Sequence, residues 1–268
     1  MQEGIEASVR GEASEPAIAT LAIIPAYNER ASIGRVVAET LRHVDAVLVV
    51  DDGSSDSTAA EAKRAGASVL VHQLNRGKGA ALRTGLEHAR RLTPIPTVVL
   101  VDADGQHDPA AIPLVMAGIA GGADIVVGSR FLGIHNAPIY RLFGLHVLSA
   151  AAALGSGVRL TDSQSGFRAL SARAVATLDL HEPAFAAESE MQFEAARLGL
   201  RMAEAPIQIR YAGAARRSPV AHGVGVLIRT IAMVALRRPS RLPLLVATPF
   251  LAVSIGSTRR VRTDGHAA

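Results

Sequence analysis

Short apolar runs alternate with amphipathic stretches through the first 130 residues of the chain. The runs are rich in β-branched residues and shorter than a typical helix, so they predict strands buried on both faces. The stretches between them repeat apolar residues three and four positions apart, which predicts helices with one face in the core. The predicted strands are residues 20–24, 46–50, 68–72, 97–101 and 125–129.

The predicted helices fall between these strands. They cover residues 31–43, a stretch that Ser57 or Thr58 can cap, residues 79–92, and a segment after Pro109. Strands separated by helices join through right-handed crossovers, so the pattern predicts an α/β fold with a mainly parallel sheet flanked by helices.

The second half of the chain has a less regular pattern. Residues 139–154 and 188–198 are predicted to be helices, and residues 202–211 a strand. Residues 161–168, between the two predicted helices, are rich in polar residues.

Polar clusters follow three of the predicted strands. Tyr27 to Glu29 follow the first strand, Asp51 and Asp52 the second, and Asp102 to Asp104 the fourth. Parallel sheets bind ligands beyond the carboxyl ends of their strands, where these clusters fall. Three convergent polar clusters favour a binding site over solvated loops.

The third cluster has the composition of a divalent metal site. Asp102, Asp104 and Gln106 provide carboxylate and amide oxygens, which suit Mg²⁺ or Mn²⁺ better than zinc. A turn rich in Asp and Gly is the alternative. His107 is a further candidate ligand beside these acids.

Composition narrows the class of protein. Hydrophobic residues make up 49% of the chain and aromatic residues 3%, so aliphatic side chains must fill the core. Cysteine is absent, which excludes disulfides and thiolate metal sites and fits a reducing compartment. Residues 1–17 contain several Glu and no apolar core, so we expect a flexible arm and no signal peptide.

Charge is unevenly distributed along the chain. The formal net charge is +4, but residues 205–263 contain ten Arg and no acid. Such a segment favours an anionic partner, either phosphates or a membrane face. Nucleic acid is disfavoured because aromatic residues, on which bases stack, are not interleaved with the arginines.

Two apolar segments lie within this basic region, at residues 224–236 and 242–255. Each is shorter than the ~20 residues that a spanning helix needs. We expect residues 222–256 to form interfacial helices and residues 257–268 a basic flexible tail, which predicts peripheral attachment at the cytoplasmic membrane face. A buried core helix is the alternative for the first segment.

Six motifs occur in the order seen in family 2 glycosyltransferases. Together they most resemble the dolichyl- or polyprenyl-phosphate mannose or glucose synthases. The motifs are Ile24-Pro25-Ala26-Tyr27-Asn28-Glu29, residues 51–58, Asn75-Arg76-Gly77-Lys78-Gly79, residues 102–109, Gly128-Ser129-Arg130 and Ser165-Gly166-Phe167-Arg168.

The resemblance implies a GT-A fold over residues 18–221, with a nucleotide half at about 18–130 and an acceptor half at about 131–221. It also implies a metal-dependent, inverting transfer of hexose from GDP-mannose or UDP-glucose to a polyprenyl phosphate. A lipid monophosphate has a second pKa of about 6 and arrives ionised, so the reaction needs no general base.

The resemblance assigns roles to individual residues of this sequence. The family residues that hold the base and ribose of the donor are matched here by Pro25, Tyr27, Glu29, Val50 and Asp52. Those matching the metal and diphosphate site are Asp102, Ala103, Asp104 and Gln106. Those matching phosphate-binding or basic positions are Arg130, Arg168, Arg210 and Arg216. Asp104, Arg130 and Arg168 are the expected catalytic residues, and Ala215 stands where the family usually has Ser before the last basic residue.

Several of these residues also have structural interpretations. Tyr27 can be a core aromatic, Glu29 a first-turn helix acid, and Arg130 a surface residue. Lys78 lies beside two glycines, as the lysine of a nucleotide-binding phosphate loop does. The full motif of that loop is missing, so we reject a phosphate loop here. Glu188 and Glu190 form either a catalytic pair or part of a solvent-exposed helix face.

Three other functions fit parts of the sequence. A related transferase with a soluble or glycan acceptor needs a base, for which Asp162 or Glu190 is a candidate. A sugar-nucleotide pyrophosphorylase shares the architecture, but the Gly-rich loop with which it usually begins is absent. A non-catalytic sugar-nucleotide sensor is disfavoured by the intact acids and arginines.

Overall fold

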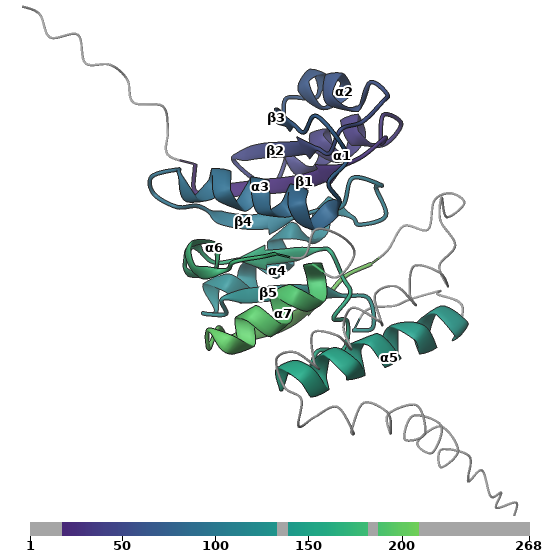
Figure 1. The fold of residues 1–268 in the computed structure, drawn as a ribbon. Helices are drawn as coiled ribbons and strands as arrows, with labels where there is room; N and C mark the ends of the chain where they lie inside the picture. Colours follow the sequence, from purple (N-terminus) through teal and green to yellow (C-terminus); the bar gives the residue numbers. More distant parts are fainter. Residues whose placement is uncertain (1–17, 133–138, 182–186, 209–268) are drawn as a thin grey trace, which may run out of the picture.

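The computed structural model describes residues 18–132, 139–181 and 187–208 of the chain (Figure 1). The strands of this part are β1 (Thr20–Ala26), β2 (Ala46–Asp51), β3 (Ser68–Val71), β4 (Thr97–Leu100), β5 (Ile125–Ser129), β6 (Arg168–Leu170) and β7 (Met202–Pro206). The helices are α1 (Ile33–Thr40), α2 (Thr58–Arg64), α3 (Lys78–Arg90), the 3-10 turn η1 (Pro109–Ala111), α4 (Ile112–Ala120), α5 (Ile139–Ser156), α6 (Ala172–Thr177) and α7 (Ala187–Arg197).

The strands form one sheet in the order β3-β2-β1-β4-β6-β5-β7. Neighbouring strands are parallel except at β6, which runs antiparallel to both β4 and β5. The predicted α/β fold with a mainly parallel sheet is therefore confirmed.

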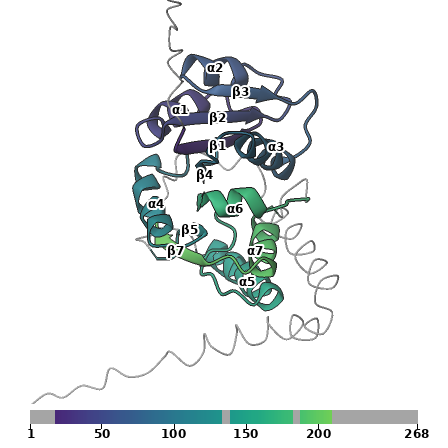
Figure 2. The same cartoon turned by 90° about the vertical axis from the view of Figure 1, so that its left-hand side faces the viewer.

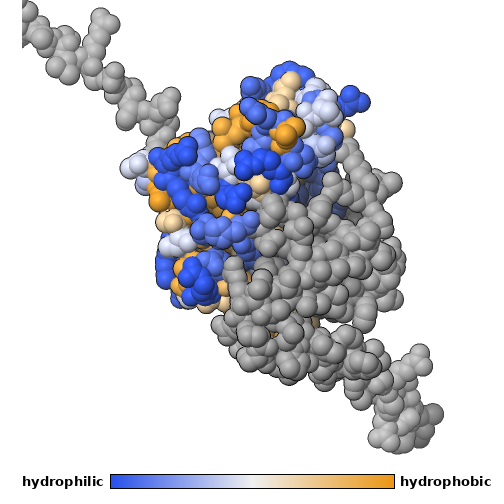
Figure 3. Space-filling model, viewed as in Figure 1, coloured by the Kyte–Doolittle hydropathy of each residue, from blue (hydrophilic) through white to orange (hydrophobic). Residues whose placement is uncertain are grey.

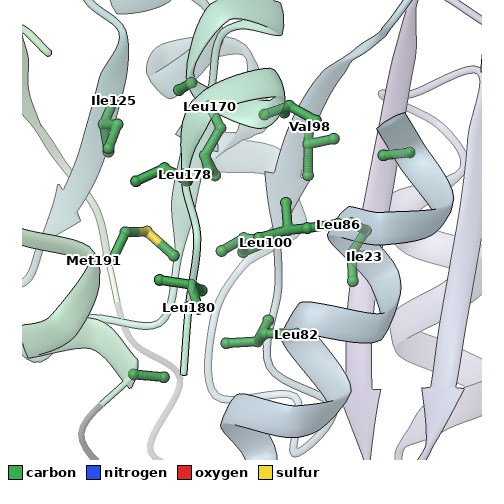
Figure 4. Close-up of a cluster of buried hydrophobic side chains, with 14 of the residues drawn as sticks. Ile23, Leu82, Leu86, Val98, Leu100, Ile125, Leu170, Leu178, Leu180 and Met191 are labelled. Atoms are coloured by element: carbon green, nitrogen blue, oxygen red, sulfur yellow. The ribbon is translucent and has the colours of Figure 1, made fainter. Parts of the chain in front are cut away.

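Helices cover both faces of this sheet (Figure 2). Alternate residues of β1 contribute to two cores, as expected for a strand buried on both faces. Leu21 and Ile23 pack on the side of α3, α6 and α7 (Figure 4), and Ala22 and Ile24 on the side of α1, α2 and α4. The sheet edge that carries the polar clusters is thus held by cores on both faces.

The second half differs from the sequence prediction in several places. The polar segment 161–168 ends in β6, a strand of only three residues that the sequence did not predict, and α6 follows it. Both are too short to show a period of their own, and β6 is fixed by pairing with β4 and β5. The strand predicted over residues 202–211 ends at Pro206.

The surface of the described part is mainly hydrophilic on the face shown in Figure 3, with small separate apolar groups. Among the described residues, no helix has both the length and the apolar character needed to cross a membrane. The predictions for residues 1–17, 222–256 and 257–268 lie outside the described residues, as do Arg210 and Arg216.

Candidate active site

The carboxyl ends of β1, β2 and β4 meet at one edge of the sheet. These strands are parallel neighbours, so the segments that follow them leave the sheet on the same side. Tyr27 directly follows β1 and Asp52 directly follows β2, and Asp102 is separated from the end of β4 by Val101. The structure thus brings together the polar clusters that the sequence predicts to converge.

Asp102 is bound by a lysine from the start of α3. Lys78 Nζ lies 2.5 Å from Asp102 Oδ1 and 2.7 Å from Glu188 Oε1, in the first turn of α7. The backbone of Gly166 lies against this group, because a Cβ built there would be 2.5 Å from Asp102 Oδ2 and 2.8 Å from Lys78 Nζ. A side chain at position 166 would therefore displace this pair or hold the loop before β6 away from it.

The ion pair changes the acidity of both partners. Burial alone would raise the pKa of Asp102, but the Lys78 ammonium, aided by His107 and Arg130, outweighs it and lowers this pKa to about 2. Burial disfavours the charged form of Lys78, but the carboxylates of Asp102 and Glu188 outweigh that effect, so the pKa of Lys78 lies above its ordinary value.

Asp104 and Gln106 lie at the exposed tip of the same loop. Asp104 Oδ1 accepts a hydrogen bond from the backbone N–H of Gln106 at 2.9 Å. Partial desolvation, together with the negative charge of Asp102, raises the pKa of Asp104. A cation bound between these acids would relieve their repulsion.

The donor set at this loop fits a divalent ion that is shared with a substrate. Within the described ranges, no three His, Cys, Asp or Glu side chains form a complete metal centre. Mg²⁺ is commonly bound by one or two carboxylates together with substrate phosphates, which is what Asp102 and Asp104 can provide. His107 Nδ1 is buried without a hydrogen-bond partner, 3.6 Å from Asp102 Oδ2, so a polar atom adjoins the site.

Asp52 is engaged by the chain itself. Its carboxylate accepts hydrogen bonds from the backbone N–H groups of Arg76 at 2.9 Å and Gly77 at 2.7 Å, and its Oδ1 lies 2.7 Å from His72 Nδ1. His72 Nε2 is in turn 3.0 Å from Thr84 Oγ1. Asp52 therefore fixes the loop that leads into Lys78, a role that the sequence did not suggest.

The other residues expected to contact the nucleotide differ in accessibility. Tyr27 is 38% exposed, so its interpretation as a core aromatic is wrong. Pro25 is half-buried in β1, and Glu29 Oε2 accepts a hydrogen bond from Ser32 Oγ at 2.9 Å just before α1. Val50 is fully buried in the core beneath α3, so its predicted contact with the nucleotide, which stays a prediction, would have to come from its backbone.

Arg130 follows β5 and is held by a buried acid. Its Nε and Nη2 donate to the two carboxylate oxygens of Asp162 at 2.5 and 2.6 Å, and its side chain is 21% exposed. Glu204 of β7 accepts hydrogen bonds from the backbone N–H groups of Thr161 and Asp162, which fixes the acid in turn. The interpretation of Arg130 as an unattached surface residue is therefore wrong.

Arg168 does not have the environment of a phosphate ligand. It is completely buried, and its guanidinium donates to the carbonyl oxygens of Ser163 at 2.6 Å, Ser165 at 2.9 Å and Glu188 at 3.1 Å. The phosphate-binding role of Arg168 stays a prediction, and in this structure three backbone carbonyls surround its charge. Arg168 thereby joins the loop before β6 to α7.

Glu188 and Glu190 are both buried, so their interpretation as part of a solvent-exposed helix face is wrong. They have different contacts: Glu188 pairs with Lys78, and Glu190 accepts a hydrogen bond from the backbone N–H of His181 at 2.9 Å. The sequence did not identify Lys78 as a partner of these acids. The signal available in the sequence was its position between Gly77 and Gly79, where a helix was predicted to begin.

Comparison with known proteins gives a consistent family match. The model described as Glycosyl transferase family 2 matches residues 21–179. The UDP-N-acetylglucosamine–dolichyl-phosphate N-acetylglucosaminyltransferase of Methanococcus voltae is 34% identical over 230 residues, covering 77% of this chain and 90% of that protein. The undecaprenyl-phosphate mannosyltransferase of Micrococcus luteus is 34% identical over 204 residues, covering 70% and 82%.

A solved structure has a similar fold. Glucosyl-3-phosphoglycerate synthase of Mycobacterium tuberculosis, in complex with Mn²⁺, uridine diphosphate and glucosyl-3-phosphoglycerate, superposes with a TM-score of 0.64 at 23% identity. The match covers 82% of this chain and 80% of that one. This likeness concerns the fold and agrees with the expected GT-A architecture.

Proposed function

Because the chain belongs to glycosyl transferase family 2, we propose that it transfers a hexose from a nucleoside diphosphate sugar to a polyprenyl phosphate. The acceptor class is supported by the relatives named for dolichyl phosphate and undecaprenyl phosphate. We propose GDP-mannose or UDP-glucose as the donor, and inversion at the anomeric carbon.

The observation that supports this function most directly is the charge arrangement at the sheet edge. Two carboxylates, Asp102 and Asp104, follow β4, and two cations, Lys78 and Arg130, contribute to the electrostatic environment of Asp102. Departure of a nucleoside diphosphate builds negative charge, which fixed cations at this edge would stabilise as it forms.

In this proposal, Asp102, Asp104 and Gln106 hold Mg²⁺ or Mn²⁺. When bound, the ion would neutralise charge on the diphosphate. The Ala103 backbone would lie beside the diphosphate, and Tyr27, Glu29 and Pro25 beside the base and ribose. Arg210 and Arg216, outside the described residues, are proposed to complete the phosphate-binding site.

The two candidate general bases have other contacts, which favours an acceptor that needs no base. Asp162 is buried and bonded to the Arg130 guanidinium, and Glu190 accepts the backbone N–H of His181. A phosphate monoester with a second pKa of about 6 is already ionised at neutral pH. An alcohol acceptor would lose its proton to a base in the transition state.

We further propose that the protein acts at the cytoplasmic face of the membrane, to which residues 222–256 attach it. The support is the acid-free stretch of ten arginines with its two apolar segments. Sedimentation of the full chain with anionic and neutral vesicles tests this point. We expect stronger binding to anionic vesicles, and negligible binding to both would refute the attachment.

The function is tested by supplying the full chain with labelled GDP-mannose, UDP-glucose and UDP-N-acetylglucosamine and with undecaprenyl phosphate in detergent micelles. We expect one donor to label the organic extract, and the labelling to stop in chelator and return with Mn²⁺ or Mg²⁺. Undecaprenol, which lacks the phosphate, is the matched control and should stay unlabelled.

Two results would overturn the proposal. Transfer to a soluble phosphorylated acceptor with no lipid product would identify the alternative transferase. Nucleotide-sugar binding with no release of nucleoside diphosphate under any acceptor condition would identify a sensor.

A further inference from the structure

Lys78 joins carboxylates from the two halves of the domain. Its ammonium contacts Asp102, from the loop after β4, and Glu188, from the first turn of α7. The two carboxylates therefore lie within reach of a single cation. Asp102 is also the first of the two acids proposed above to hold the divalent ion, so the ammonium and a metal ion compete for the same side chain.

The loop that precedes Lys78 is held in place by contacts within the chain. The N–H of the preceding Gly77 donates to Asp52 Oδ2 at 2.7 Å, and Gly53 packs so closely on the same loop that a Cβ there would lie 2.7 Å from the carbonyl carbon of Leu74. The ammonium of Lys78 lies close to the backbone of Gly166. With its ammonium paired to two carboxylates and 27% of its side chain exposed, Lys78 is held in place more firmly than a fully exposed lysine.

Electrostatic repulsion favours the Lys78 ammonium over a divalent ion at Asp102 when no nucleotide is bound. Without nucleotide, a divalent ion must displace an ammonium that lies 2.5 Å from Asp102 Oδ1, and it must then remain beside that ammonium. Like charges in a partly buried site repel strongly. A nucleoside diphosphate supplies the negative charge and the additional oxygen ligands that the ion lacks in the free protein.

We propose that Lys78 is a positioning residue that occupies the cation position of Asp102 in the free protein and thereby makes metal binding depend on the nucleotide. The proposal rests on the metal assignment of the proposed function. Glu188 keeps the ammonium within the site when the metal takes Asp102. Metal and nucleotide diphosphate then bind together.

Manganese binding without turnover tests this role. The free Mn²⁺ signal in electron paramagnetic resonance is measured for the full chain alone, with UDP and with GDP. For the natural chain we expect Mn²⁺ to bind at least about tenfold more tightly with one of the nucleotides than without. In Lys78→Met, nucleotide-free Mn²⁺ affinity should rise about tenfold, because the ammonium no longer competes for Asp102. A tenfold change corresponds to about 1.4 kcal/mol.

Two variants separate the charge at position 78 from the net charge of the chain, and a third covers a failure to fold. Lys78→Arg keeps the positive charge and should keep nucleotide-free binding weak. Arg76→Met removes an exposed positive charge two residues away and should change Mn²⁺ affinity less than about twofold, since exposed charges are screened. If Lys78→Met does not fold, Lys78→Gln replaces it, with the same expected rise.

The proposal is overturned if the natural chain binds Mn²⁺ equally with and without nucleotide, or if a folded neutral variant at position 78 shows no rise. The same rise in Arg76→Met would also overturn it, because the effect would then come from net charge alone. These results are separate from the labelling of lipid: a chain that binds Mn²⁺ as expected but labels no lipid would contradict the proposed function and leave the role of Lys78 supported.

Discussion

The part of the sheet that we propose to bind nucleotide (the nucleotide half, residues 18–130) and the part that we propose to bind acceptor (the acceptor half) hold their charged side chains by opposite means. In the nucleotide half, a buried carboxylate is held by backbone N–H groups, as Asp52 is by Arg76 and Gly77. In the acceptor half, the buried Arg168 is held by three carbonyl oxygens, and the buried Asp162 is paired with Arg130, at the end of the nucleotide half. Buried charges in both halves are thus satisfied by groups of the chain itself.

This contrast separates structural charges from charges available to a ligand. A buried group whose hydrogen bonds are made within the chain is costly to replace, whatever ligand binds nearby. Asp104 and Gln106 are exposed at the loop tip, where a ligand can reach them. We therefore expect substitutions at the buried charges to affect stability first, and substitution of Asp104 to affect turnover first.

The largest expected effect is that of Asp104→Asn on turnover. Loss of one of the two carboxylates proposed to bind the ion weakens the metal site, and a loss of about 4 kcal/mol of transition-state stabilisation corresponds to about a thousandfold in rate. Because Asp104 is exposed, the midpoint of thermal unfolding should not move. Steady-state labelling of lipid and a melting curve measure the two quantities; a stable variant with full turnover would contradict the metal assignment.

The next effect is that of Arg168→Met on stability. The substitution leaves three buried carbonyl oxygens without their donor, which we expect to lower the free energy of unfolding by about 3 kcal/mol. Urea denaturation measures this loss. Arg168→Lys should recover only part of it, because an ammonium cannot reproduce the planar guanidinium geometry. Unchanged stability with impaired use of the acceptor would support Arg168 as a phosphate ligand.

The halves also differ in how far the sequence predicts them. In the nucleotide half, each strand is a distinct apolar run and each helix has its own period, so β1 to β5 and the helices between them were predicted within a few residues. In the acceptor half, β6 and α6 are too short for a period and depend on pairing across the sheet. The local sequence pattern cannot predict a strand that is stabilised only by pairing with strands distant in the sequence.

The candidate site shows the same limit. The motifs predicted which residues would gather at the sheet edge, because strand ends follow from the local pattern. They could not predict that Arg168 faces carbonyls while Asp102 faces Lys78, since both facts depend on the approach of the loop at Gly166 and the first turn of α7. Burial of a charged side chain is decided by such long-range contacts.

A smaller effect is expected where the two halves touch, at Gly166. In Gly166→Ala, the new Cβ would lie 2.5 Å from Asp102 Oδ2, so the loop or the Asp102–Lys78 pair must shift. Overpacking of this kind typically costs about 2 kcal/mol of stability, and here it should also weaken Mn²⁺ binding in the presence of nucleotide. Gly34→Ala is the matched control, because a Cβ there meets only Glu61 O at 3.9 Å, within ordinary contact distance. Equal behaviour of the two variants would argue against close contact between the halves.

The smallest expected effect distinguishes two carboxylates of the nucleotide half that both accept backbone N–H groups. Asp52 uses both of its oxygens, Oδ1 for Arg76 and Oδ2 for Gly77, so Asp52→Asn must lose one acceptor and turn an amide N–H toward a donor. We expect a loss of about 1 kcal/mol in urea denaturation. Asp45 accepts the N–H groups of Ala19 and Thr20 with the single atom Oδ2, so Asp45→Asn can keep both bonds and should leave stability unchanged. If both variants were equally stable, the hold of Asp52 on the loop before Lys78 would be weaker than its geometry implies, and the fixed position of that lysine would have to come from Asp102 and Glu188 alone.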